Sequence, residues 1–269
     1  MKQSKVPSGR RQPAAAVREL RLTPLMLSLV CLGVTPALAQ TLPTGFSQAA
    51  GEVSASRSGA VMAINQGTQR AIAQWQSFSI GSGGTVNVAQ PSSASVLLNR
   101  VTGNELSTIA GSLNANGHVY LVNPNGVLFS STSSVNVGGL VASTLGITND
   151  NFMAGKQLVF TRDDGNAATV VDKGSITAAS GGLVALMGAQ AINEGTINVA
   201  RGTAALVSAN KVTVDFEGDG LTRFTIPADS KATAALVQNS GSITAHGGGI
   251  ALLAASEVNA QVVEQRGGP

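Results

Sequence analysis

The sequence predicts an all-β protein whose body is a solenoid of stacked parallel strands. Three observations predict this fold class: short phrases recur along the chain, no helical periodicity accompanies them, and the composition suits a narrow interior. Of the 269 residues 43% are hydrophobic, only 3% are aromatic, and 32 are glycine. This much apolar area offsets the entropy lost on folding, so we do not expect a disordered chain.

Residues 1–39 are predicted to be an export signal. A basic start precedes the apolar run Leu25–Val34, and Ala37-Leu38-Ala39 precedes the expected cleavage before Gln40. This run is well short of the roughly 20 residues of a membrane-spanning helix, which argues against an anchor. It contains Cys31, the only cysteine, so no disulfide is expected afterwards.

The leader also accounts for the net positive charge of the chain. It holds six of the 17 basic residues and one of the 14 acidic ones, which leaves 11 basic and 13 acidic residues. A net charge of −2 gives no support for nucleic-acid binding. No second apolar stretch is long enough to span a membrane, so no stable membrane insertion is expected.

One phrase recurs in the body: a glycine, a small hydroxyl residue, a β-branched residue or leucine, a polar and a small residue, then a glycine-bearing turn and an apolar strand. Each coil of a parallel solenoid pairs with the coils above and below at roughly 4.8 Å, and alternate residues point inward. The copies are GTVNVA at Gly84, GSLNANGHVYLV at Gly111, the degenerate SSVNVGGLVAS at Ser133, GSITAASGGLVALM at Gly174, GTINVA at Gly195 and GSITAHGGGIALLA at Gly241.

The spacing of the copies predicts the coil length. Gly174 and Gly195 are 21 residues apart, Gly111 and Gly174 are 63 apart (three times 21), and Gly195 and Gly241 are 46 apart. A period near 21 predicts roughly eight or nine coils after residue 84, a rod on the order of 40 Å long. An antiparallel β-sandwich is the alternative, but it does not require a phrase to recur at multiples of one spacing.

Two segments break the pattern. Residues 40–83, which include the only tryptophan, are predicted to cap the first coil, because a solenoid end exposes unpaired strand edges. Lys211–Ile226 alternates apolar and polar residues around Gly218-Asp219-Gly220, which predicts a β-hairpin protruding from the rod. Residues 84–269 are the predicted β-helix, and their end just after a repeat unit suggests a truncated or split member.

Three long phrases carry a resemblance: AIAQWQSFSIGSGGTVNV, LLNRVTGNELSTIAGSLNANGHVYLVNPNGVLF and VGGLVASTLGITNDNF. They resemble the N-terminal secretion domain of two-partner secretion proteins, the filamentous haemagglutinin and high-molecular-weight adhesin family. The resemblance covers essentially the whole mature chain. It implies a right-handed parallel β-helix with an N-terminal cap, and export through the periplasm to the surface of a Gram-negative bacterium. It also implies a partner, an outer-membrane β-barrel transporter with periplasmic POTRA domains.

The resemblance also singles out candidate site residues. Asn123-Pro124-Asn125-Gly126 matches the family's second signature turn, and Asn99 and Arg100 lie near the place of a first Asn-Pro-Asn-Leu signature that this sequence lacks. Proline fixes φ while Asn and Gly tolerate positive φ, so the tetrapeptide is predicted to form a rigid turn. Two roles stay open for it: to start coil formation, or to present a fixed epitope to the transporter.

No catalytic, cofactor or metal site is predicted. His118 and His246 adjoin glycines and are expected to be surface turn residues. DFEGDG, with Asp215, Glu217, Asp219 and Gly220, imitates the start of a calcium loop, but the twelfth position is Ile226 instead of a glutamate, so an acidic hairpin tip is expected.

Two other functions are alternatives to that of an adhesin. A β-helical polysaccharide-active enzyme needs carboxylates and a basic residue on one face. The candidates are Arg162, Asp163, Asp164, Asp172 and Lys173, but most of them are expected to line a solvated loop. A toxin-delivery protein has a similar front end. The sequence therefore predicts a non-enzymatic secretion module, with any host-cell or bacterial target contacted by missing downstream repeats.

Overall fold

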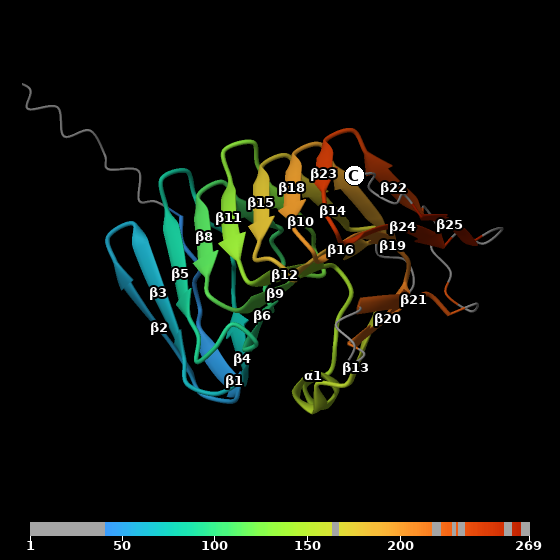
Figure 1. Cartoon of the computed structure of the whole chain (residues 1–269). Coiled ribbons are helices and arrows are strands. Elements are labelled where there is room, and N and C mark those ends of the chain that lie inside the picture. Colours follow the sequence, from blue (N-terminus) through green and yellow to red (C-terminus); the bar gives the residue numbers. More distant parts are fainter. Residues whose placement is uncertain are drawn as a thin grey trace, which may run out of the picture. The chain divides into compact units, whose positions relative to one another are not determined.

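The computed structural model describes residues 41–162, 167–216, 222–227, 230, 235–255 and 260–264. Within them the chain forms strands β1 to β25 and one short helix, α1 (Asn149–Ala154) (Figure 1). Three sheets of mainly parallel strands make up a β-helix, and a further three-stranded sheet lies outside it. No helix in the described part is both long and apolar enough to cross a membrane.

Each coil of the β-helix passes through the three sheets in turn. Sheet 1 contains, in spatial order, β1 (Ser47–Ala50), β4 (Arg70–Trp75), β6 (Val96–Val101), β9 (His118–Val122), β12 (Gly139–Ser143), β16 (Leu183–Gly188), β19 (Thr203–Ser208), β24 (Gly249–Ala255) and β25 (Ala260–Glu264). Sheet 2 contains β2 (Val53–Ser58), β3 (Val61–Gln66), β5 (Thr85–Ala89), β8 (Ser112–Ala115), β11 (Ser134–Val137), β15 (Ser175–Ala178), β18 (Thr196–Val199) and β23 (Ser242–Thr244). Sheet 3 contains β7 (Ser107–Ile109), β10 (Val127–Phe129), β14 (Thr169–Asp172), β17 (Gln190–Asn193) and β22 (Leu236–Asn239).

The recurring phrases stack directly on one another in sheet 2, where their strands lie side by side (Figure 1). The second residue of each phrase pairs with the second residue of the phrase on the next coil. The paired series is Thr85, Ser112, Ser134, Ser175, Thr196 and Ser242. The predicted parallel β-helix is therefore confirmed.

The predicted number of coils was wrong. Gly111 to Gly174 spans two coils instead of three, because an insertion that includes α1 and β13 (Gln157–Thr161) lies outside the β-helix. Gly195 and Gly241 precede strands on neighbouring coils, with one insertion between them. Six described strands of sheet 2 follow residue 83, where eight or nine coils were predicted.

The predicted hairpin is confirmed and belongs to a larger unit. β20 (Lys211–Phe216) pairs antiparallel with β21 (Thr222–Thr225), and β13 pairs with the other edge of β20. Residues 217–221 at the hairpin tip lie outside the described residues. Neither β13 nor α1 was predicted from the sequence. The sheet that the two insertions form together was therefore not predicted either.

This unit gives sheet 1 a second buried face. Inside the coil, alternate residues of all three sheets form one core; outside, apolar side chains of both insertions pack on the opposite face of sheet 1. Phe152 and Phe160, for example, pack against Tyr120 with ring centroids 5.8 and 6.4 Å apart. Strands buried on both faces are continuously apolar, which is why every residue of β12 and β16 is buried, whereas β11 alternates.

Antiparallel strands cover the first coil. β3 and β4 pair parallel with β5 and β6, whereas β2 and β1 pair antiparallel with β3 and β4. This pairing uses backbone groups that an open solenoid end leaves exposed. Trp75 is fully buried beneath, with the rings of Phe46 and Phe78 at 5.1 and 5.5 Å.

Glycines occupy the corner before sheet 2 because neighbouring coils approach very closely there. A Cβ on Gly111, Gly195 or Gly241 lies 2.1 to 2.3 Å from the carbonyl oxygen of the equivalent glycine on the coil before. Real Cβ atoms do not come so near to a backbone oxygen. At these three positions glycine lets both backbones keep this spacing. Ser133 is the one residue with a side chain among the six equivalent positions.

We predict that Gly195→Ala lowers the free energy of unfolding by about 2 kcal/mol, because the new methyl group overlaps the Gly174 carbonyl oxygen. Gly249→Ala is the control, since a Cβ there has no atom within 4 Å and the backbone is not left-handed. That variant is expected to change stability by less than about 0.5 kcal/mol. Urea denaturation measures both values, and equal effects would contradict the close-approach explanation.

Candidate functional site

The Asn123–Gly126 turn carries the chain from β9 in sheet 1 to β10 in sheet 3. The Gly126 amide donates to the Asn123 carbonyl at 3.1 Å, which closes a tight turn. Gly126 has a φ of +123°, but neither asparagine has a positive φ. The expectation that the asparagines serve here by tolerating positive φ was therefore wrong.

The Asn123 side chain is fully buried, and both ends of its amide are hydrogen-bonded. Nδ2 donates to the Glu105 carbonyl and to the Ser107 hydroxyl, both at 2.9 Å. Oδ1 accepts from the Asn125 backbone amide at 2.9 Å and from Asn125 Nδ2 at 3.0 Å. A buried amide with four hydrogen bonds stabilises one turn geometry, because a different geometry would leave its buried polar atoms without partners.

The turn connects three successive coils. Glu105 and Ser107 precede and begin β7 on the coil before, and Asn125 Nδ2 also donates to the Gly103 carbonyl there at 2.8 Å. On the coil after, the Ser143 carbonyl accepts from the Asn123 amide at 2.9 Å. The tetrapeptide therefore fixes the stacking of its neighbours as well as its own shape.

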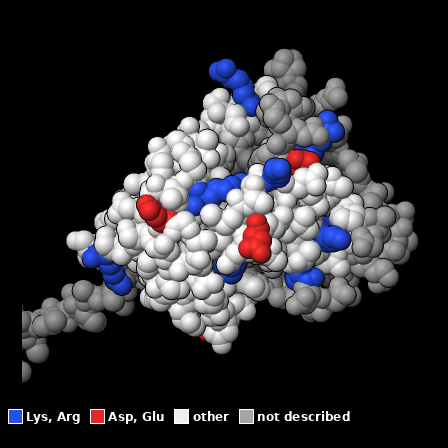
Figure 2. Space-filling view, turned by 90° about the horizontal axis from the view of Figure 1, so that it is seen from below, with Lys and Arg blue, Asp and Glu red and all other residues white. Residues whose placement is uncertain are grey.

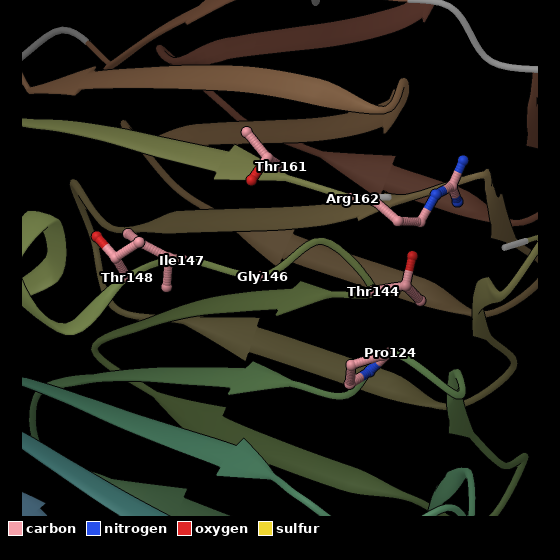
Figure 3. A pocket seen from close by; sticks show the side chains of 7 residues that line it. All are labelled: Pro124, Thr144, Gly146, Ile147, Thr148, Thr161 and Arg162. Atoms are coloured by element: carbon pink, nitrogen blue, oxygen red, sulfur yellow. The ribbon is translucent and has the colours of Figure 1, made fainter. Parts of the chain in front are cut away.

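Pro124 and Asn125 are the exposed residues of the turn. Pro124 lines a cavity of about 370 Å³, which is shown in Figure 3. Thr144 lies on the side of Pro124, whereas Thr161 and Arg162 come from β13 and the residue after it. This cavity separates the turn from the insertion that covers sheet 1.

Asn99 and Arg100 lie in β6, one coil before the turn, where Arg100 pairs with Val122. Asn99 is fully buried; its Oδ1 accepts from Trp75 Nε1 at 3.0 Å. Arg100 donates to the Asn149 side chain and to the Ile147 carbonyl, both at 2.6 Å. Burial lowers the pKa of Arg100. Asn99 thus joins the cap to the core, while Arg100 fixes the start of α1.

Sequence reasoning missed the partners of these residues. Thr148 is the N-cap of α1, where its hydroxyl accepts from the Asn151 amide, and this Thr-Asn-Asp start is a recognisable helix signal. Arg70 also contacts the helix, with its guanidinium 5.0 Å from the centre of the Phe152 ring. No sequence pattern connects Arg70 or Arg100 with a helix some fifty or more residues later.

The histidines were predicted to be surface turn residues. For His118 this was wrong, because it begins β9 and is partly buried; burial and the Arg70 charge lower its pKa. His246 does lie exposed in a turn. The described residues contain no cluster of three or more potential metal-ligating side chains.

Several other candidates lie outside the described residues: Ala37, Ala39 and Gln40 of the cleavage site, Asp163 and Asp164, and Glu217, Asp219 and Gly220 of the calcium-like loop. Of those described, Asp215 accepts a hydrogen bond from Gln157 Nε2 at 2.9 Å. Lys173 pairs with Glu194 at 3.0 Å on the surface of adjacent coils. Each of these two contacts joins neighbouring strands or coils of the fold.

Asp172 was expected in a solvated loop, and this was wrong: its side chain is fully buried. It stacks with Asn193 and Asn239 on the next two coils of sheet 3. Asp172 Oδ1 accepts from the Gly174 amide at 2.9 Å, as Asn193 Oδ1 does from Gly195 at 3.2 Å. Oδ2, however, has no hydrogen-bond partner. Desolvation raises the pKa of Asp172 to about 6.

We predict that Asp172→Asn stabilises the protein at pH 7 by about 2–3 kcal/mol, because an amide suits this position on both later coils. The folded-state pKa lies above the unfolded value of 3.8. The unfolded chain therefore loses its proton first, and the wild type loses stability as pH rises from about 4 to 6. Urea denaturation from pH 4 to 8 measures the difference between the two proteins.

Asn193→Asp is the matched control and is expected to introduce the same kind of penalty above pH 6. A difference between wild type and Asp172→Asn that does not change with pH contradicts the prediction.

Comparison with known proteins agrees with this fold. The TPS secretion domain family model matches residues 39–268. A heme/hemopexin-binding protein of Haemophilus influenzae is 37% identical over 237 residues, which are 84% of this chain and 25% of that protein. Another protein of the same name and species is 38% identical over 127 residues, 47% of this chain and 14% of its own length.

Among solved structures, the crystal structure of the HMW1 secretion domain from Haemophilus influenzae matches with a TM-score of 0.70 and 31% identity, over 78% of this chain and 55% of that chain. This chain spans about a quarter of the first curated relative. The family match covers most of the sequence, including the Asn123–Gly126 turn. The chain therefore belongs to the TPS secretion domain family, whose members are exported across the outer membrane with the help of a transporter in that membrane.

Proposed function

We propose that this chain is the N-terminal secretion module of a larger adhesin, and that POTRA domains of its transporter bind it before it folds. The burial of the signature residues is the observation that supports this most directly. Asn99 and Asn123 are fully buried in the fold. A partner can read such side chains only in a chain that is still extended.

Strand addition is the proposed mode of recognition. An extended peptide that adds to an exposed sheet edge gains affinity from main-chain hydrogen bonds and specificity from alternate side chains. The sequence is rich in strand-forming segments of this kind. On the face shown in Figure 2, basic and acidic side chains are interspersed on a largely uncharged surface, so this face of the folded chain has no large patch of one charge.

Folding outside the cell then makes export hard to reverse. Each coil emerging from the transporter stacks on the coil before it, as in other solenoids. We propose that the Asn123–Gly126 turn acts in this step, because its hydrogen bonds connect three coils. Of the two roles considered for the turn, the geometry thus favours the start of coil formation over a transporter epitope.

The remaining assignments follow from this proposal. Residues 1–39 are the signal that directs the chain to the periplasm, residues 40–83 the cap, and residues 84–269 the β-helix. The module acts by recognition and folding, without catalysis. Contact with host cells or other bacteria belongs to segments of the whole protein beyond this module.

We predict that export depends on the transporter and, for variants of the turn, on folding. The full chain is produced in a Gram-negative host with and without its outer-membrane transporter, and immunoblots compare extracellular with cell-associated protein. Asn123→Ala removes hydrogen bonds to the preceding coil, so we expect it to lower the free energy of unfolding by about 2–3 kcal/mol and to reduce export. Asn125→Ala is expected to have a smaller effect on both.

Val135→Ala is the matched control, because Val135 is a buried core residue of β11 outside the turn and its truncation costs a similar free energy. Export of Asn123→Ala and Val135→Ala should fall together. Export without the transporter contradicts the secretion function. If Asn125→Ala abolishes export while the purified domain keeps its stability, the turn is an epitope and the folding role is wrong.

A further inference from the structure

A second cavity, of about 640 Å³, lies between β21 and the turns that join sheet 2 to sheet 1 on three successive coils. Its volume falls within the usual range of small-molecule sites. Glycines from all three turns line it, including Gly182, Gly202 and Gly248. Because these residues lack side chains, the backbone itself forms one wall, and a ligand can approach it closely.

Arg201 lies at the one position in this wall where glycine is missing. The equivalent residues on the coils before and after are Gly181 and Gly247, with φ values of +80° and +71°. Arg201 has the same left-handed backbone, with a φ of +53°, and is the only non-glycine residue with positive φ in the described part of the chain.

The backbone hydrogen bonds confirm this equivalence of positions. The Gly181 amide donates to the Ala200 carbonyl, and the Arg201 amide donates to the His246 carbonyl, both at 2.8 Å. A Cβ at a left-handed position destabilises the fold relative to glycine. A strained residue beside a cavity, where both neighbouring coils have glycine, indicates that the side chain itself has a function.

The charged side chains that line this cavity are basic. Arg201 and, from β21, Arg223 both line it, and none of the described lining residues is acidic. The Arg201 side chain is exposed, and the described residues offer its guanidinium neither a hydrogen bond nor an ion pair. Across the hairpin from Arg223 lies Asp215, whose carboxylate accepts from Gln157.

Other lining groups match a ligand that is partly polar and partly apolar. Thr203 and Thr222 contribute hydroxyl groups, and Phe224 and Leu253 contribute apolar surface. Arginine binds carboxylate and sulfate groups through paired hydrogen bonds. Sugar hydroxyls bond to threonine and to backbone groups, while the CH faces of a sugar ring pack on an aromatic ring.

From these observations we propose that this cavity binds an acidic saccharide, one carrying a carboxylate or sulfate group, with Arg201 as the principal anion-binding residue. This activity goes beyond secretion and gives the module a contact of its own with acidic polysaccharide. The glycine wall leaves room for the sugar ring, and Arg201 and Arg223 both line the cavity that would hold its charged group.

The test uses the full chain and a sulfated, heparin-derived disaccharide as the probe. Isothermal titration calorimetry compares it with an unsulfated disaccharide and with inorganic sulfate. We expect wild-type protein to bind the sulfated disaccharide most tightly. Arg201→Gly, which should fold because both neighbouring coils have glycine there, is expected to weaken binding at least about tenfold. Arg57→Gln, an exposed cation on the distant strand β2, is expected to leave it unchanged.

A second measurement does not depend on any variant. In ¹⁵N-labelled protein, the probe should shift the amide signals of Gly182, Gly202 and Gly248. The proposal is overturned if the wild type does not bind, if Arg201→Gly keeps its affinity, or if the shifted signals lie elsewhere. If the unsulfated disaccharide binds equally well, the ligand does not need an acidic group. If inorganic sulfate binds equally well, the proposal that the ligand is a saccharide is overturned.

Discussion

Close stacking of backbone on backbone at the corners of each coil is the constraint on which this structure depends. Two columns of glycines meet it. In one, a Cβ on Gly195 lies 2.3 Å from the Gly174 carbonyl oxygen; in the other, a Cβ on Gly202 lies 2.1 Å from that of Gly182. The same carbonyl groups accept hydrogen bonds from the next coil, such as Thr196 N to Gly174 O at 2.8 Å. These contacts therefore hold neighbouring coils in register at both corners.

The stacked coils explain where polar and inserted residues are placed. Between sheets 1 and 3 and between sheets 3 and 2, asparagine or aspartate side chains satisfy the backbone of the turns, as Asn123 and Asn193 do. Insertions leave the coil only after strands of sheet 1 and return to cover that sheet. The Asn123–Gly126 turn belongs to this same system of cross-coil hydrogen bonds.

The sequence predicts the repeated strands of the β-helix but not the segments inserted between them. The strand phrases at Gly111, Gly174 and Gly241 sufficed to predict a parallel stack, because stacking imposes the same residues at the same place on each coil. The spacing alone predicted the wrong number of coils, because 63 residues can form either three short coils or two coils and an insertion. The unbroken apolar run of Leu183–Gly188 is the signal that was available for a second covering layer.

The sequence indicates a turn at residues 123–126, but it does not indicate the contacts that the side chains of the turn make. Asn123 and Asn125 were expected to matter because asparagine tolerates positive φ. Instead, their side chains hydrogen-bond to residues on the preceding coil. Such partners become visible only when the stacking is known. The buried carboxylate of Asp172 and the strained backbone of Arg201 depend on neighbours in the same way, and their own sequence surroundings do not mark them.

The most direct test of this account is a cross-link between coils on either side of the first insertion. Asn136 and Thr177 are paired partners on β11 and β15, at exposed positions. With the only native cysteine removed by Cys31→Ser, the pair Asn136→Cys and Thr177→Cys should form a disulfide under mild oxidation, since paired residues lie roughly 4.8 Å apart. Asn136→Cys with Asn198→Cys, two coils apart, should not. Cross-linking of the second pair, or failure of the first in folded protein, would contradict the stacked register.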